Sequence, residues 1–428
     1  MTPFNRKLLY FILLYTCIEG LVINLTFPSK VGYVFKDFLL VGGVILLLAD
    51  NHGQPFGSLS RLALPVGLFA LIQVSYLAMP GDMPLLAKLV GLKMRLLYIP
   101  AVLLGYRFVR DPMDVYRLSR VLAIAAIPVS IFGIYLYFAG PSALVGMGAT
   151  YSAIVTSTTG FWRVPGTFNS PGQYGLYLMF TSAIVIGLLM TPGLTLRTRV
   201  ILWVSLALML FAVLVSGSRT PLVLIVASAG IVTLGLGKAG RIVSWGIGMY
   251  LIFAIGFATF GPGVADRVGS IASTEHFERF RTTYFGQMFL PMMLETPMGI
   301  GLGAATIGAR HFTELGQVRL VESYFGIISL ETGVLGLLAF LMVSAAILLL
   351  LQGAKTLMRA APAAPIWYAL AAYVVIVTLL GPVSTPLDAA PGNLYYWLSL
   401  GMLAKLYDLQ RYALAAELPS VGYSVHPA

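Results

Sequence analysis

The stretch from Glu322 to Gln352 reads ESYFGIISLETGVLGLLAFLMVSAAILLLLQ. A helix of roughly 20 apolar residues crosses the hydrocarbon core of a bilayer, and this stretch exceeds that length with two charged residues, Glu322 and Glu331. It therefore predicts a transmembrane helix. A long polar segment, 261–321, precedes it in a chain with only 10% charged residues. We expect this segment and the helix after it to form the functional face of the protein.

The composition predicts an integral membrane protein. The chain has 428 residues, 58% of them hydrophobic, and a mean hydropathy of +0.89, which excludes an ordinary soluble domain. The formal net charge of +11 comes from short basic clusters between apolar runs. Such clusters are typical of orientation signals, so we expect no nucleic-acid partner. A single cysteine, Cys17, excludes an intrachain disulfide.

The apolar runs predict an all-α polytopic fold with about twelve transmembrane helices in a single membrane domain over 1–428. The first run follows Arg6 and Lys7 and has no small-residue cleavage site, so we expect a retained signal anchor. The runs cover residues 8–27, 31–49, 62–79, 86–106, 118–139, 172–191, 200–216, 220–237, 242–260, 322–352, 366–382 and 393–410.

The charge pattern predicts the orientation. When alternate connections are assigned to opposite sides, more than half of the 27 basic residues fall on the side that holds both termini. The positive-inside rule makes this side cytoplasmic. The two long connections, 140–171 and 261–321, then lie outside, which places the functional face there. Within 261–321, apolar residues at helical spacing from Phe277 to Met288 predict an amphipathic helix on the membrane surface.

Two arginines stand beside predicted membrane helices on the outer side. Arg163 begins the segment RVPGTFNSPG, and Arg219 lies in the tight turn SGSRTP between two apolar runs. A guanidinium held at that depth can bind a lipid diphosphate with two parallel hydrogen bonds. The alternative for either residue is a structural arginine that extends toward the headgroups.

A third candidate is Glu322 at the entrance of the helix that follows the long loop. A carboxylate there is costly unless it is paired, and partial desolvation would make it a general base. The alternative is an i, i+3 ion pair with Arg319. Glu331 lies nine positions further on, about half a turn away around the helix, so we expect it to serve a different environment.

Further anion contacts are predicted from other basic residues of the outer half. Lys93 and Arg95 either bind substrate or pair with nearby charges such as Lys36 and Asp37. No metal-ligand spacing or cofactor motif is present, because the four histidines stand far apart and the glycine run at 299–303 is interpreted as a flexible turn. The candidate substrate-binding residues are Arg319, His311, Arg279, Arg281, Lys93 and Arg95.

Together these motifs resemble the O-antigen polymerase and O-antigen ligase family of bacterial inner-membrane proteins. The resemblance covers roughly the second half of the chain and depends on the combination of short motifs. It rests on Arg163 to Pro171, Ser216 to Arg219, Gly299 to Gly303, Glu322 to Tyr324 and Glu331 to Gly333, with weaker support from Lys36-Asp37 and Gly91 to Pro100.

The resemblance implies a GT-C-like glycosyltransferase that takes a sugar chain from undecaprenyl diphosphate outside the cytoplasmic membrane. Arg163 and Arg219, with Arg319 as a third candidate, would then neutralise the diphosphate without a metal, and Glu322 would be the base. Membrane lipids, a flippase and a chain-length regulator are the implied partners.

Three functions stay open at this point. The ligase branch of the family usually carries a histidine where this chain has Glu322, which favours a polymerase of exopolysaccharide or O-antigen repeats. Ligation to lipid A core or another acceptor is the first alternative, with His311 as the base. Transport of polysaccharide or of the lipid-linked oligosaccharide is the second. The sequence lacks the internal repeat and paired interrupted helices of many transporters.

Overall fold

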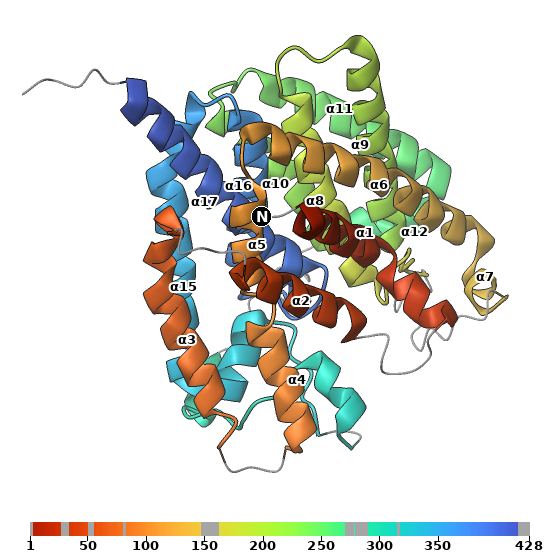
Figure 1. Cartoon of the computed structure of the whole chain (residues 1–428). Coiled ribbons are helices and arrows are strands. Elements are labelled where there is room, and N and C mark those ends of the chain that lie inside the picture. The colour runs from red at the N-terminus through yellow and green to blue at the C-terminus, as the bar shows by residue number, and fades with distance from the viewer. Residues whose placement is uncertain are drawn as a thin grey trace, which may run out of the picture.

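The computed structural model describes residues 3–26, 34–49, 55–79, 83–146, 162–269, 278, 290–314 and 317–417 (Figure 1). These residues form helices and connections, and no β-strand occurs among them. The prediction of an all-α chain is therefore confirmed for the described ranges.

The first half of the chain contains α1 (Pro3–Thr26), α2 (Phe35–Ala49), η2 (Gly57–Leu62), α3 (Ala63–Ser75), α4 (Leu85–Leu96), α5 (Ala101–Phe108), α6 (Pro112–Ala139), α7 (Pro141–Gly146), α8 (Pro171–Leu189) and α9 (Leu196–Ser216). The second half contains α10 (Arg219–Gly235), α11 (Arg241–Phe260), α12 (Pro262–Gly269), α14 (Leu290–Glu295), η5 (Ile307–Phe312), α15 (Tyr324–Arg359), α16 (Ala364–Leu380) and α17 (Gly392–Glu417).

Eight helices in the described part of the chain are long and apolar enough to cross a membrane. Two shorter apolar helices, α10 and α16, accompany them. The protein therefore has the character of a polytopic membrane protein, but the predicted count of about twelve is not confirmed. The run predicted at 31–49, for example, contains a helix of only 15 residues, α2.

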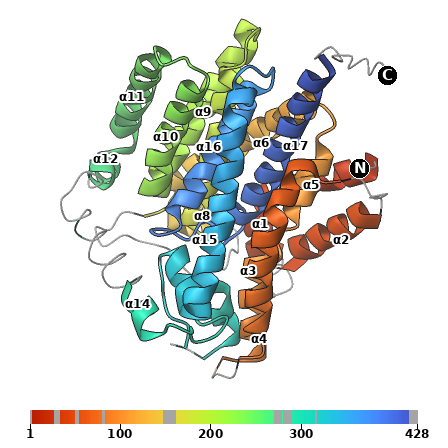
Figure 2. The ribbon, with the colours of Figure 1, turned by 90° about the vertical axis from the view of Figure 1, so that its left-hand side faces the viewer.

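The helices pack around α8 and α16, which lie near the middle of the bundle. Figure 2 shows α11 and α2 at opposite edges with these helices between them. A window of α8 long enough to span the membrane is 83% buried inside the protein, whereas that of α11 is 17% buried. One continuous apolar core runs from Leu9 in α1 to Leu406 in α17. Such a central helix must be apolar on all sides, as the sequence of α8 is.

Local signals fix the helix ends that matter for the site. The Ser170 hydroxyl accepts from the Gln173 amide and caps α8, whose first residue is Pro171. Helix α9 ends at Ser216 and is followed by Gly217, which has a φ of 61°. This left-handed conformation turns the chain sharply before Arg219.

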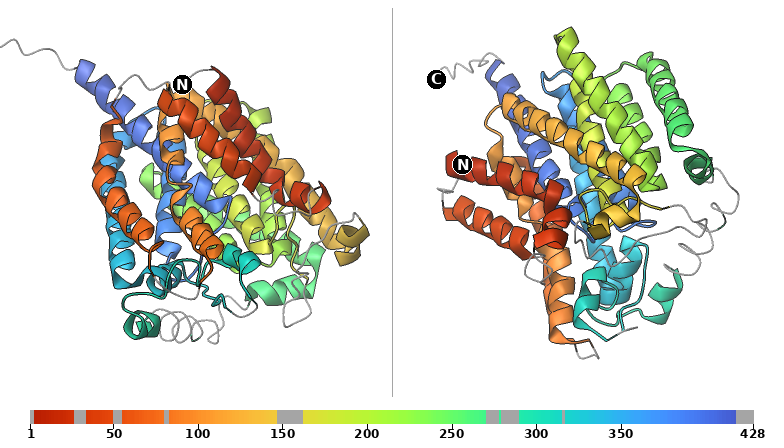
Figure 3. Two further views of the ribbon diagram at one scale, coloured as in Figure 1. Left: turned by 60° about the horizontal axis from the view of Figure 1, so that its bottom comes forward. Right: turned by 90° about the vertical axis from the view of Figure 1, so that its right-hand side faces the viewer.

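Several connections meet at one end of the bundle. The Leu21 amide at the end of α1 donates to Thr167 O (2.9 Å), and the Val164 amide donates to Val215 O (3.2 Å). The start of α15 bonds the end of α16, because the Phe325 amide donates to Gly381 O (3.1 Å). We call this end, which carries 163–171, 216–219, 322–325 and 381–391, the site end. In Figure 3, α4 (orange) and α14 (teal) lie at the same end of the molecule as the start of α15 (cyan).

Helix α15 is broken at Gly333, where φ is 64° and ψ is −162°. The carbonyls freed by the break are satisfied by the glycine run: Ile300 N donates to Leu330 O (2.8 Å) and Gly301 N to Glu331 O (3.1 Å). In the other direction, the Val334 amide donates to Pro297 O (2.9 Å). The run interpreted as a flexible turn is therefore a hydrogen-bonded support for the broken helix.

Candidate active site

Arg163 is held by the turn between α9 and α10. Its Nη2 donates to Ser218 Oγ (3.2 Å) and its Nε to Ser216 O (3.4 Å). Ser218 Oγ in turn donates to Pro171 O (3.0 Å) at the start of α8. The first two predicted motifs thus form one hydrogen-bonded unit, and the guanidinium of Arg163 is partly buried within it.

Arg219 is the first residue of α10 and follows directly from this unit. Its side chain is partly exposed, and neighbouring Ser218 is buried. The helix dipole places partial positive charge at the same helix start. Arg219 therefore adds its charge where backbone amides already favour an anion.

Glu322 precedes the start of α15 and is exposed to solvent. The next residue, Ser323, is buried and caps the helix, accepting from the Gly326 amide at 3.0 Å. Ser323 Oγ also donates to Gly381 O (3.3 Å). The carboxylate is therefore accessible, and the backbone that carries it is fixed on two sides.

Arg163 lies close enough to both Arg219 and Glu322 for their charges to act on its guanidinium. Burial lowers the pKa of Arg163, the positive charge of Arg219 lowers it further, and the negative charge of Glu322 opposes this lowering. The structure thus places Arg163, in the segment before α8, within electrostatic reach of Arg219 at the start of α10 and of Glu322 just before α15. Their formal charges sum to one positive charge, which suits an anionic group.

The other predicted substrate contacts are distributed differently. Arg319 is exposed, and its amide donates to Ala304 O (2.8 Å). Among the described residues, no ion pair joins Arg319 to Glu322. His311 belongs to η5, but its side chain lies outside the description, as do Arg279, Arg281 and most of the predicted amphipathic helix.

Arg95 lies in a buried ion cluster. Its Nη2 contacts Glu331 Oε2 at 3.1 Å and its Nη1 contacts Asp388 Oδ1 at 2.9 Å, with all three side chains at most 1% exposed. Glu331 Oε1 also accepts from the Thr306 amide (2.8 Å) and hydroxyl (2.8 Å). This position favours a structural role for Arg95 over direct substrate contact. Removing one partner from such a cluster typically costs about 3–5 kcal/mol.

Asp388 is the less firmly held carboxylate of the cluster. Besides Arg95, its partner is the Ile307 amide, at 3.4 Å. The pKa of Asp388 is raised to about 6, because the effect of burial is the largest: the Arg95 charge opposes this rise and the Glu331 charge adds to it. One guanidinium thus faces two carboxylates, and Asp388 takes up a proton as the pH falls through about 6.

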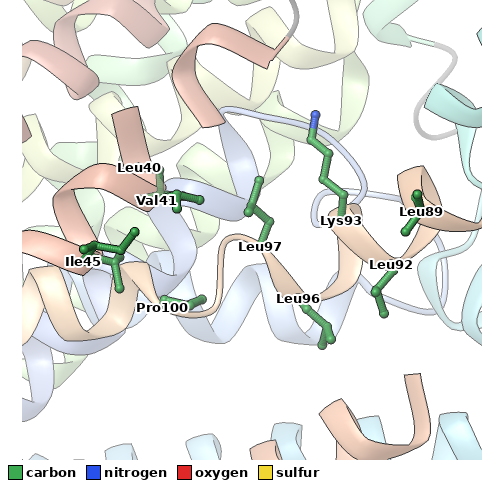
Figure 4. Close-up of a pocket in the computed structure, with 10 residues that line it drawn as sticks. Leu40, Val41, Ile45, Leu89, Leu92, Lys93, Leu96, Leu97 and Pro100 are labelled. Atoms are coloured by element: carbon green, nitrogen blue, oxygen red, sulfur yellow. The ribbon is translucent and has the colours of Figure 1, made fainter. Parts of the chain in front are cut away.

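Lys93 belongs to a second group of paired charges. It forms an ion pair with Asp37, which also accepts from Tyr98 Oη at 2.7 Å, and Lys36 pairs with Glu19 nearby. Lys93 is the one charged residue among ten that line a groove of about 400 Å³ between α2 and α4 (Figure 4). Of the two alternatives predicted for Lys93, the structure therefore shows the ion pair with a nearby charge, Asp37.

Sequence reasoning missed two partners of these clusters. Glu19 lies inside the first apolar run and Asp388 in the short connection before the last one. A carboxylate in a predicted membrane run is a usable signal, because it requires a partner. The identity of the partner depends on helix packing, which the sequence pattern alone does not reveal.

The fold and the site together define a helical membrane protein with two arginines and an accessible carboxylate at one end of its bundle. Comparison with protein-family models finds no match, and comparison with curated proteins finds none either. Among the described residues, no three His, Cys, Asp or Glu side chains are grouped as metal ligands would be.

Proposed function

We propose that this chain is a membrane glycosyltransferase that polymerises undecaprenyl-diphosphate-linked oligosaccharide repeats of an exopolysaccharide or O-antigen on the outer side of the bacterial inner membrane. The observation that carries the proposal is the proximity of Arg163 to both Arg219 and Glu322 at the site end. Two guanidiniums with one accessible carboxylate are the groups that displacement of a diphosphate by a hydroxyl requires.

In the proposed reaction, the acceptor sugar hydroxyl attacks the anomeric carbon of the donor sugar. A new carbon–oxygen bond forms while the bond from that carbon to the diphosphate oxygen breaks. Glu322 accepts the hydroxyl proton, and the leaving oxygen takes the bonding electron pair. Arg163 and Arg219 stabilise the negative charge that develops on undecaprenyl diphosphate.

The arrangement of burial supports this division of roles. Arg163 is fixed by Ser216 and Ser218, so its guanidinium needs little reorganisation when the diphosphate binds. Glu322 is exposed, so an acceptor that arrives from solvent can reach it. Ligation to another acceptor would use the same three residues, and the product distinguishes the two reactions.

Purified protein in detergent tests the proposal with an undecaprenyl-diphosphate oligosaccharide as the donor. We expect glycans longer than the input by whole repeats, with release of undecaprenyl diphosphate. A product joined to added lipid A core instead would indicate a ligase. Movement of an unchanged donor across sealed vesicles, with no new glycan in detergent, would replace the enzyme proposal with transport.

A further inference from the structure

The buried ion cluster of Arg95, Glu331 and Asp388 joins three separate parts of the chain, one of which belongs to the site end. Arg95 belongs to α4, Glu331 to the part of α15 before its break, and Asp388 to the connection between α16 and α17. The two ends of the guanidinium are divided between the carboxylates, with Nη2 on Glu331 and Nη1 on Asp388. The cluster therefore ties α4, α15 and the 381–391 connection together.

The same segments hold the start of α15. The Arg95 guanidinium lies 5.0 Å from the centre of the Tyr324 ring, a cation–π distance. The Tyr324 amide donates to Ser384 O (3.0 Å), in the connection that also carries Asp388. Glu322 lies only two residues before Tyr324, so its backbone is set by contacts that depend on the cluster.

The cluster has no access to a substrate, because its three charged side chains are at most 1% exposed. Its effect on the site must therefore pass through Tyr324 and the connection around Ser384. We propose that Arg95 is a positioning residue: through Glu331 and Asp388 it clamps the start of α15 and so orients Glu322 toward the acceptor hydroxyl. This inference rests on the proposed function for the role of Glu322.

The two carboxylates are held unequally, which gives the clamp a strong and a weak side. Glu331 accepts from Arg95, from the Ala305 amide (3.0 Å), and from both the amide and hydroxyl of Thr306 (each 2.8 Å). Asp388 accepts only from Arg95 and, at 3.4 Å, from the Ile307 amide among the described contacts. When the cluster is weakened, we therefore expect the contact between Arg95 and Asp388 in the 381–391 connection to be lost first.

Arg95→Lys is the informative substitution. A lysine ammonium keeps the positive charge, but it is a compact group that lacks the planar fork joining two carboxylates. A matched control is Asp408→Asn. Asp408 is also buried and accepts from Tyr106 Oη (2.8 Å) and the Ser58 amide (3.0 Å). It lies 16 positions after the start of α17, roughly 24 Å along the helix from the site end.

The first measurement does not require enzymatic activity. A nitroxide label on Glu322→Cys reports the mobility of this position, because the natural Cys17 is buried. In detergent-purified full-length protein, we expect the label to be clearly more mobile when Arg95→Lys is added. Adding Asp408→Asn instead should leave its spectrum unchanged, even if both proteins lose thermal stability to a similar extent.

The second measurement uses the protein with Glu322 intact. Arg95→Lys should lower kcat about 10- to 100-fold, in the range that misplacement of a catalytic group by about 1 Å produces. The donor KM should stay within about twofold, since Arg163 and Arg219 are untouched. Asp408→Asn should change kcat by less than about threefold.

Unchanged label mobility in Arg95→Lys would overturn the clamp, and so would equal changes in the Asp408→Asn control. If Arg95→Lys does not fold, Asp388→Asn gives the same test on the weak side, with a smaller mobility increase expected and no increase contradicting the proposal. If the wild-type protein transfers no sugar, the proposed function fails, while the label still decides whether Arg95 restrains position 322.

Discussion

At the scale of single residues, the candidate site combines fixed cations with an accessible carboxylate. Arg163 is oriented by Ser216 O and Ser218 Oγ, while Glu322 stands exposed in front of a capped helix. Charge stabilisation benefits from groups that are fixed before the reaction, whereas proton transfer needs a group that the acceptor can reach. The partly buried Arg163 therefore suits charge stabilisation, and the exposed Glu322 suits proton transfer.

Arg219→Lys separates charge from geometry. Lysine preserves the positive charge at the start of α10 but loses the two-pronged contact to a diphosphate. We expect kcat/KM for the lipid-linked donor to fall about 10- to 100-fold in the detergent assay. Arg117→Lys, at an arginine with a 64% exposed side chain near the start of α6, is the matched control and should retain wild-type kcat/KM. Equal kcat/KM values for the two variants would remove Arg219 from the site.

The pKa of Asp388 predicts a pH-dependent stability. The pKa of Asp388 is raised from 3.8 to about 6 in the folded protein. Between these two pH values the folded protein therefore binds a proton at Asp388 that the unfolded protein has released. The stabilising contribution of this proton to the free energy of unfolding is fully present below about pH 4 and is lost as the pH rises through about 6. The loss is at most about 2–3 kcal/mol.

The measurement is thermal unfolding of wild-type protein and Asp388→Asn at several pH values. The asparagine does not titrate, so wild type should lose stability relative to Asp388→Asn between pH 4 and 7. A difference that is constant over this range would show that Asp388 does not bind a proton in the folded protein.

At the scale of elements, the break in α15 is the feature that the sequence did not predict. The apolar run 322–352 predicts one uninterrupted helix, and α15 does extend over Tyr324–Arg359. The break at Gly333 is stabilised by amides of Ile300 and Gly301, about 30 residues earlier in the chain. Periodicity within a helix carries no information about such a distant donor.

Gly333→Ala tests the importance of this break. A Cβ at Gly333 would lie 2.2 Å from Pro297 O, and its φ of +64° disfavours any L side chain. We expect a loss of at least about 2 kcal/mol in unfolding free energy. Gly353→Ala in the same helix is the control, because no atom lies within 4 Å of its added Cβ. Equal melting temperatures for the two variants would contradict the described break.

At the scale of the whole molecule, the sequence predicts the class of fold better than its details. Apolar runs identify most of the membrane helices, because bilayer thickness sets their length. Because successive helices alternate in direction, the predicted order of helices also places Arg163, Arg219 and Glu322 at one end of the bundle. The partners of Arg95 and Lys93 were not predictable, since they depend on which helices pack together.

The orientation of the bundle stays a prediction that reporter fusions can test. Fusions near Gly148, Thr274 and Ala389 should report an extracytoplasmic position, because those connections lie on the side opposite to most basic residues. Fusions near Asn51, Pro112, Ala361 and the C-terminus should report the cytoplasm. Two or more reversals would overturn the predicted topology and the placement of the site outside the cytoplasm.

The most direct test of the central claim is the single-turnover rate of Glu322→Gln with bound undecaprenyl-diphosphate oligosaccharide. Glutamine keeps the shape and hydrogen bonding of the side chain but cannot accept the acceptor proton. We predict a rate about 10²–10⁴-fold below wild type, with the donor bound at wild-type affinity and the melting temperature unchanged. A stable Glu322→Gln protein that transfers sugar at a near wild-type rate would contradict the assignment of Glu322 as the base.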